Sequence, residues 1–192
     1  MFRKTALAVM TISAVVCGSS AFAADPTGSF GTGSIHFTGT VTNSPCNIAP
    51  GDDALAVSFG QVSHKMLAAV GDTSSSQPVV IHLTDCSFDP DTTGTPANPV
   101  GLMSRVNVAF TGASTTDHKA FVSTGTATNV AVQLLKSDNT TVIEANSVPA
   151  QTDAQQLQAG DNQLRFFARL LATGVATPGS VDSTVTYTLT YL

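Results

Sequence analysis

Apolar and polar residues alternate in short runs along most of the chain, and turn residues separate these runs. Gly, Pro, Asp and Asn fill the connections, as in residues 89–96 and 177–179. The pattern predicts strands at 34–42, 54–62, 78–84, 105–111, 130–136, 140–145, 162–171 and 183–191. Many short strands are typical of an all-β sandwich or barrel. Only residues 64–69 suggest a helical turn, and it is short.

The alternation is most regular near the two ends of the chain. In the last run, threonines occupy the even positions 184–190, and apolar or aromatic residues occupy the odd ones: Val185, Tyr187, Leu189 and Tyr191. This predicts a half-buried strand. In the first run, Ile35, Phe37, Gly39 and Val41 alternate in the same way, after a glycine-rich stretch at 24–33. From the pattern alone, that run is either an ordinary first strand behind a tail or a segment used outside its own domain.

The first residues have the features of a secretory signal peptide. Arg3 and Lys4 precede an apolar run at 6–16, and Ala21-Phe22-Ala23 is the small-x-small pattern of a cleavage site. We expect cleavage after Ala23. The apolar run is shorter than the roughly 20 residues that a membrane-spanning helix needs, so we expect no anchor in the mature protein. Lipidation at Cys17 is the less favoured alternative, because bulky Val16 precedes it.

Removal of residues 1–23 changes the charge and cysteine counts. Six basic and thirteen acidic residues remain, a formal net charge of −7 that argues against nucleic acid as a partner. Two cysteines remain, Cys46 and Cys86, and we expect them to form a disulfide in an oxidising compartment. Closing that loop stabilises the fold by at most about 4 kcal/mol. Two buried free thiols are the alternative.

Residues suited to catalysis or metal binding do not form a known motif. The histidines His36, His64, His82 and His118 are scattered, and the sequence contains neither Gly-x-Ser-x-Gly nor Cys-x-x-Cys. Asp85, Asp89 and Asp91 are close in sequence, but they lack the calcium-loop pattern, so a polar loop is favoured. We therefore expect no enzymatic activity, no cofactor and no metal site.

Several motifs together resemble the chaperone-usher pilins, the major-subunit type of type 1 and P fimbriae. Gly39 lies seven residues before Cys46, and Cys86 ends the run Ile-His-Leu-Thr-Asp-Cys. Residues 127–135 resemble another strand of the family. Gly179 is fourteenth from the C-terminus and Tyr191 is penultimate, as in family members. The final Leu192 departs from the polar residue that is common there.

The resemblance implies an incomplete immunoglobulin-like β-sandwich, a pilin fold that lacks its C-terminal strand. A donor strand from another subunit completes the fold, after a periplasmic chaperone has first occupied the gap. The resemblance divides the mature chain into a donor-strand extension at 24–39 and a pilin domain at 40–192. Ile35, Phe37 and Gly39 are then the donor residues, and the groove-edge strand that the chaperone grips contains Gly179, Val185, Tyr187, Leu189 and Tyr191.

We therefore expect a structural subunit of a bacterial fimbria that supports cell adhesion. The resemblance implies export through the periplasm to the cell surface, with other pilus subunits, a periplasmic chaperone and an outer-membrane usher as partners. A minor adaptor or a terminating subunit is one alternative, and a secreted carbohydrate-binding β-sandwich is another. A tip adhesin is disfavoured, because such subunits usually carry an extra receptor-binding domain for which this chain has no room.

Overall fold

The computed structural model describes residues 33–192. The expected signal peptide at 1–23, Cys17 and the first part of the expected extension, 24–32, lie outside the described residues. Residues Thr42–Leu192 form one compact unit, and the described residues before Thr42 belong to a separate unit. Within residues 33–192, no helix has the length and apolar character that crossing a bilayer requires.

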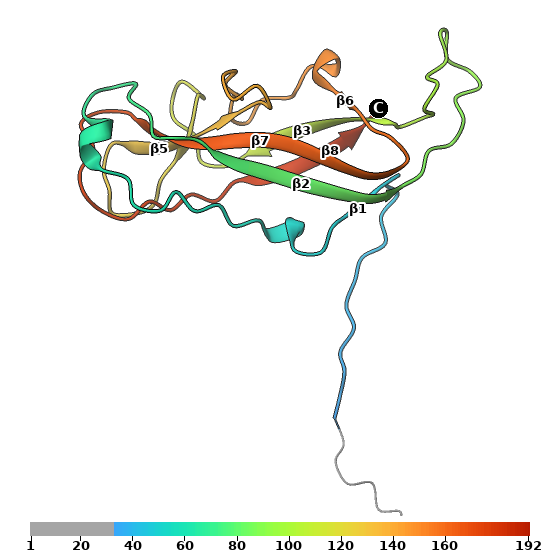
Figure 1. Cartoon of the computed structure of the whole chain (residues 1–192), viewed down its shortest axis with the longest axis horizontal. Coiled ribbons are helices and arrows are strands. Elements are labelled where there is room, and N and C mark those ends of the chain that lie inside the picture. The colour runs from blue at the N-terminus through green and yellow to red at the C-terminus, as the bar shows by residue number, and fades with distance from the viewer. Residues whose placement is uncertain (1–32) are drawn as a thin grey trace, which may run out of the picture. The chain divides into compact units, whose positions relative to one another are not determined.

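The compact unit consists of two antiparallel sheets that pack face to face (Figure 1). The strand order is β1-β2-β7-β5-β4 in the larger sheet and β6-β3-β8 in the smaller one. The strands are β1 (Asn47–Ile48), β2 (Gln77–Cys86), β3 (Arg105–Thr111), β4 (Phe121–Val122), β5 (Val130–Leu135), β6 (Gln155–Gln156), β7 (Gly160–Ala172) and β8 (Thr186–Tyr191). Three 3-10 turns lie between them: η1 (Asp52–Ala54), η2 (His64–Leu67) and η3 (Gln151–Asp153).

The core lies between the two sheets, where the alternation of each long strand turns its apolar side chains inward. On β7, Leu164, Phe166, Ala168 and Leu170 are buried. Phe166 meets Phe110 of β3 edge to face, with ring centroids 5.1 Å apart. Such a contact adds to the burial of two large side chains, each of which stabilises the fold by roughly 1.5–3 kcal/mol.

Five of the expected strands form, and three do not. The runs at 78–84, 105–111, 130–136, 162–171 and 183–191 correspond to β2, β3, β5, β7 and β8. The expectations for 34–42, 54–62 and 140–145 are wrong, although Val142 makes a single bridge to Leu135. Alternation reports where side chains point, whereas a strand also needs a neighbouring backbone. The expected helical turn is present as η2.

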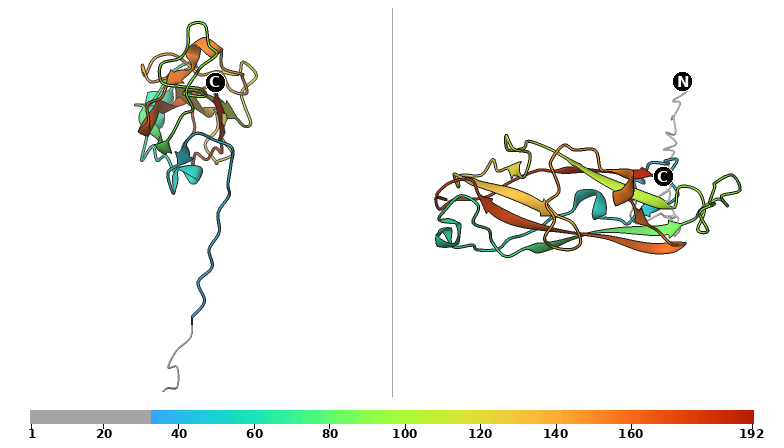
Figure 2. Two further views of the ribbon diagram at one scale, coloured as in Figure 1. Left: turned by 90° about the vertical axis from the view of Figure 1, so that its right-hand side faces the viewer. Right: turned by 90° about the horizontal axis from the view of Figure 1, so that it is seen from above.

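The sandwich is elongated and has two opposite ends (Figure 2). The turn end contains η2 and the connection 173–178, and the Ala176 N–H joins them by donating to the Leu67 carbonyl at 3.0 Å. The disulfide end contains Cys46, Cys86 and the chain's C-terminus, where the Leu192 N–H donates to the Arg105 carbonyl at 2.8 Å.

Candidate functional site

An open apolar groove runs along one side of the sandwich. It consists of two cavities, of about 240 and 590 Å³, which share Val57, Phe59 and Val181 in their linings. One wall is the segment 55–63, and the other is the stretch 180–187 that leads into and begins β8. The groove continues to the turn end, where His64, Leu67 and Ala176 line it.

The floor of the groove is the hydrophobic core itself. Side chains from both sheets reach it: Val79, Ile81, Phe110, Val132, Leu134, Ala168 and Leu170. All of these except Val79 are buried core residues. The opening between the walls therefore leaves the space between the two sheets unfilled along this side.

The first wall has the alternation of a strand but no strand partner. Leu55, Val57 and Phe59 line the groove, and Leu55 and Val57 remain partly exposed. Among the described residues, the backbone of 55–62 makes one hydrogen bond, from the Gly60 N–H to the Ser58 hydroxyl. An edge with free N–H and C=O groups can pair with another chain.

The second wall contains the free edge of β8. Arg105 and Leu192 exchange both backbone hydrogen bonds, at 3.2 and 2.8 Å. Hydrogen-bonded pairs alternate along an antiparallel ladder, so the backbone groups of the even-numbered threonines of β8 face β3. Those of Tyr187, Leu189 and Tyr191 point the other way, where no described strand pairs with β8. The side chains of these three residues are half-buried against the core.

A hydrogen bond ties the last strand to the start of the first wall. The Tyr187 hydroxyl donates to the Asp52 backbone carbonyl at 2.8 Å. The Asp52 carboxylate in turn accepts the backbone N–H of His82 and lies 2.8 Å from its Nδ1. The backbone N–H of His82 is the main reason that the pKa of Asp52 falls below its usual value, and partial desolvation opposes this.

The two tyrosines of β8 differ in how their hydroxyls are satisfied. Burial raises the pKa of both Tyr187 and Tyr191. The Tyr191 hydroxyl is buried and has no hydrogen-bond partner among the described residues. Ser44 lies close enough to offset part of the rise in the pKa of Tyr191, but its hydroxyl donates to the Cys46 carbonyl instead.

Gly179 has a packing role at the groove wall. A Cβ atom at this position would overlap the backbone of Thr126 and Ala127. This close approach is held by the Ala127 N–H, which donates to the Ser180 carbonyl at 2.9 Å. The glycine singled out in the sequence therefore lets the chain pass close to residues 126–127 before it enters β8.

The expected donor residues lie in the unit Met1–Val41 and carry no strand. Ile35 and Phe37 are 80% and 86% exposed. A Cβ at Gly39 would contact nothing within 4 Å. Two large apolar side chains on the same face of a short segment are therefore left without a core of their own.

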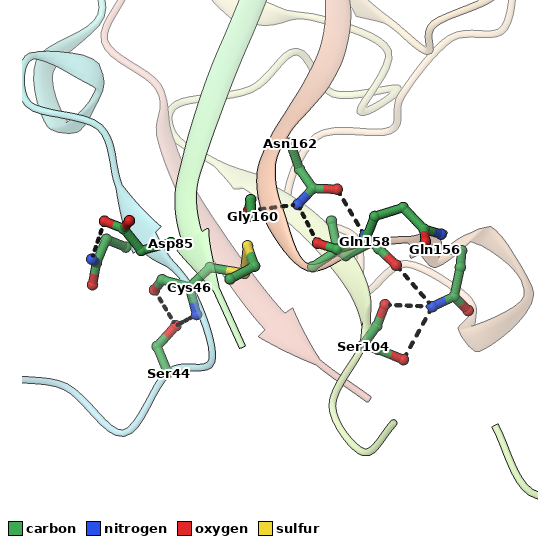
Figure 3. The surroundings of a disulfide bond; sticks show 11 residues. Ser44, Cys46, Asp85, Ser104, Gln156, Gln158, Gly160 and Asn162 are labelled. Carbon is green, nitrogen blue, oxygen red and sulfur yellow. Dashed lines mark hydrogen bonds between the residues drawn. A yellow bond between two sulfur atoms is a disulfide. The ribbon is translucent and has the colours of Figure 1, made fainter. Parts of the chain in front are cut away.

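Cys46 and Cys86 form the expected disulfide, which joins the residue before β1 to the end of β2 (Figure 3). Nearby, the Asn162 side chain donates to the carbonyls of Gln158 and Gly160. The Gln156 side chain donates to the carbonyl and hydroxyl of Ser104. These bonds fix the disulfide end, from which the segment before Cys46 leaves the domain. In the part of the chain described, no group of three or more His, Cys, Asp or Glu could hold a metal ion.

Sequence reasoning identified one wall of the groove and missed the other. Val185 and Tyr187 were expected at its edge, and both line it. Leu55, Val57 and Phe59 were not expected there, although their alternation in the run 54–62 was visible in the sequence. Only the structure shows that the segment 55–62 has no strand beside it among the described residues.

The known proteins that resemble this chain in sequence are fimbrial subunits. The profile of the family described as "Fimbrial protein" matches residues 35–192. The chain is 34% identical to the type-1 fimbrial protein A chain of Escherichia coli, covering 96% of this chain and 97% of the relative. It is 35% identical to the fimbrial subunit type 1 of Klebsiella pneumoniae, covering 96% and 97%.

Solved structures agree with this result. A chaperone-usher pilus structure matches with a TM-score of 0.70 and 25% identity, over 88% of this chain and 100% of that one. The P pilus rod subunit PapA matches in fold with a TM-score of 0.64 at 22% identity, over 78% and 100%.

The chain belongs to the fimbrial protein family. It is a structural subunit of an extracellular fimbria, and its family is not one of enzymes. The expected all-β pilin sandwich and the expected family are both confirmed.

Proposed function

We propose that the groove accepts residues 35–41 of another copy of this chain as an added strand, and that fimbriae grow by repetition of this step. The observation that carries the proposal is the groove with two unpaired edges, the segment 55–62 and the outer edge of β8. An added strand would satisfy both edges with backbone hydrogen bonds and place alternate side chains on the apolar floor.

The donor segment matches the groove in residue type and spacing. Ile35, Phe37 and Val41 share one face with Gly39, and the polar residues at even positions share the other. Each apolar side chain buried on the floor stabilises the complex by roughly 1.5–3 kcal/mol. Gly39 has no side chain, so it would allow the donor backbone to approach the floor closely. Several such contacts and a backbone ladder make dissociation slow.

Before assembly, the same groove exposes core side chains and two backbone edges, which is an aggregation hazard. We propose that a periplasmic chaperone covers it by pairing with β8, and that an outer-membrane usher exchanges the chaperone for the donor segment of the next subunit. Signal-peptide cleavage after Ala23 and export through the periplasm precede this exchange. The 34% identity to the major fimbrial subunit SMF-1 of Stenotrophomonas maltophilia, over 83% of this chain and 92% of that one, supports a role in the fimbrial shaft.

The donor role is tested by substitutions on the two faces of one segment. In the full chain, Ile35→Asp with Phe37→Asp should abolish filaments on the cell surface, measured by electron microscopy. His36→Asp with Thr38→Asp places the same charges on the opposite face and should leave filaments. Both variants should still accumulate in the periplasm as chaperone complexes. Filaments of normal length from the first variant would refute the donor role.

A further inference from the structure

Large apolar side chains are exposed at both ends of the sandwich. At the turn end, Met66, Val70 and Val175 are 51%, 77% and 67% exposed. They are neighbours, because the Ala176 N–H donates to the Leu67 carbonyl and the Gly71 N–H donates to the Ala172 carbonyl. The name "turn patch" is used for Met66, Val70 and Val175.

At the disulfide end, Leu102 and Met103 are also exposed. They are anchored next to the disulfide, since the Leu102 N–H donates to the Asp89 carbonyl at 2.8 Å and Asp89 follows Cys86 by three residues. We call Leu102 and Met103 the "loop patch". Single exposed apolar residues are common on proteins, but two such groups at opposite ends of a subunit suit a head-to-tail polymer.

The connection between the donor segment and its own domain is short. Only residues 42–45 lie between Val41 and Cys46, so the two can be at most about 17 Å apart. Cys46 is buried at the disulfide end. If residues 35–41 occupy a neighbour's groove, Cys46 of the donor copy must therefore lie within about 17 Å of the groove end from which Val41 emerges.

The groove ends beside the turn patch, where His64, Leu67 and Ala176 line it. A donor copy seated at this end would cover the turn patch of its acceptor with its own loop patch. Each interior subunit would then have both patches covered once, by one neighbour on each side. Two disulfide ends in contact would instead leave every turn patch exposed.

Each patch has a charged side chain beside it. Lys65 is exposed beside Met66, and among the described residues it has no carboxylate partner. Asp89 is exposed beside the loop patch, since its backbone carbonyl accepts the Leu102 N–H. Asp72 also lies at the turn end, where its carboxylate accepts the Ala69 N–H and keeps its negative charge. Pairing of Lys65 with Asp89 across such a contact would favour the head-to-tail arrangement.

We propose that the loop patch of each copy docks on the turn patch of the next, so that a body-to-body contact between Leu102 or Met103 and Met66, Val70 or Val175 accompanies the donated strand. The proposal rests on the proposed donor-strand function and extends it from the groove to the surface beside it. The partner is a second copy of this chain.

Cross-linking of assembled fimbriae tests this contact. In the full chain, Met103→Cys with Val175→Cys, treated with a short bismaleimide on intact filaments, should give a ladder of covalent multimers on a denaturing gel. Val70→Cys with Leu102→Cys should give the same ladder. The control is Val148→Cys with Val175→Cys, because Val148 is fully exposed but belongs to neither patch. All positions are exposed, so filaments are expected from every pair.

The outcomes separate the two proposals. Filaments that give no ladder from either patch pair, or an equal ladder from the control pair, overturn the end-to-end contact and leave the donor strand standing. Normal filaments from the chain with Ile35→Asp and Phe37→Asp overturn the donor strand itself, and the end-to-end contact loses its basis with it.

Discussion

The Tyr187 hydroxyl donates a 2.8 Å hydrogen bond to the Asp52 backbone carbonyl, and so joins the last strand to the turn that begins the opposite wall of the groove. The groove has few other direct links of this kind, since the backbone of 55–62 is almost unpaired within the described chain. We infer that this bond helps to keep the two walls at a fixed separation while the groove is empty.

Replacement of Tyr187 by Phe should therefore weaken the unfilled subunit. The ring remains against the core and only the hydrogen bond is lost, so the free energy of unfolding should fall by about 1 kcal/mol. Tyr191→Phe is the matched control, because its hydroxyl is buried without a partner and its removal should cost nothing. Urea unfolding of the mature chain measures both. Equal losses in the two variants would show that the Asp52 contact has no special role.

Asp52 should also make stability depend on pH. Its pKa is lowered from 3.8 in the folded chain, so its contribution is complete above that value and is lost as the pH falls through the lowered pKa. Asp52→Asn should be less stable than the wild type at neutral pH, and the difference should shrink as the pH falls below 3.8. Asp53→Asn is the control, since the Asp53 side chain is exposed and accepts no hydrogen bond from another described residue. A difference that is independent of pH would contradict this account.

Gly179→Ala should destabilise the domain by roughly 1–3 kcal/mol, because the new methyl group would force the chain away from the backbone of Thr126 and Ala127. Gly33→Ala has no atom within 4 Å of the added carbon and should leave stability unchanged. Thermal unfolding of the two mature variants provides the comparison. If the first variant melted like the second, close packing would not explain the glycine.

The sequence predicted the long strands well because their alternation coincides with real pairing. β3 was predicted at its observed bounds, Arg105–Thr111, and β2, β5 and β7 to within a few residues. β1, β4 and β6 have two residues each, too few for any periodic signal. The run 140–145 alternates but pairs with the end of β5 through only the one bridge between Val142 and Leu135, beside which the Ile143 N–H donates to the Leu134 carbonyl.

The two other failures, at 34–42 and 54–62, have one physical cause. Leu55, Val57 and Phe59 alternate like a strand, as do Ile35 and Phe37, but neither segment has a strand partner among residues 33–192. An alternating pattern reflects which side chains become buried, whereas a strand also requires a hydrogen-bonded neighbour, which residues 33–192 do not supply to either segment. Both failures are expected if these two segments pair only across a subunit boundary.

The binding of a donor peptide to an empty groove tests the central claim most directly. The acceptor is the mature chain with Ile35→Asp and Phe37→Asp, which keeps its groove but cannot donate. The ligand is a synthetic peptide of residues 24–41. The account predicts that the wild-type peptide raises the unfolding temperature in a concentration-dependent way, and that a peptide with Phe37→Asp does not. A stable monomer whose unfolding temperature ignores the wild-type peptide would contradict it.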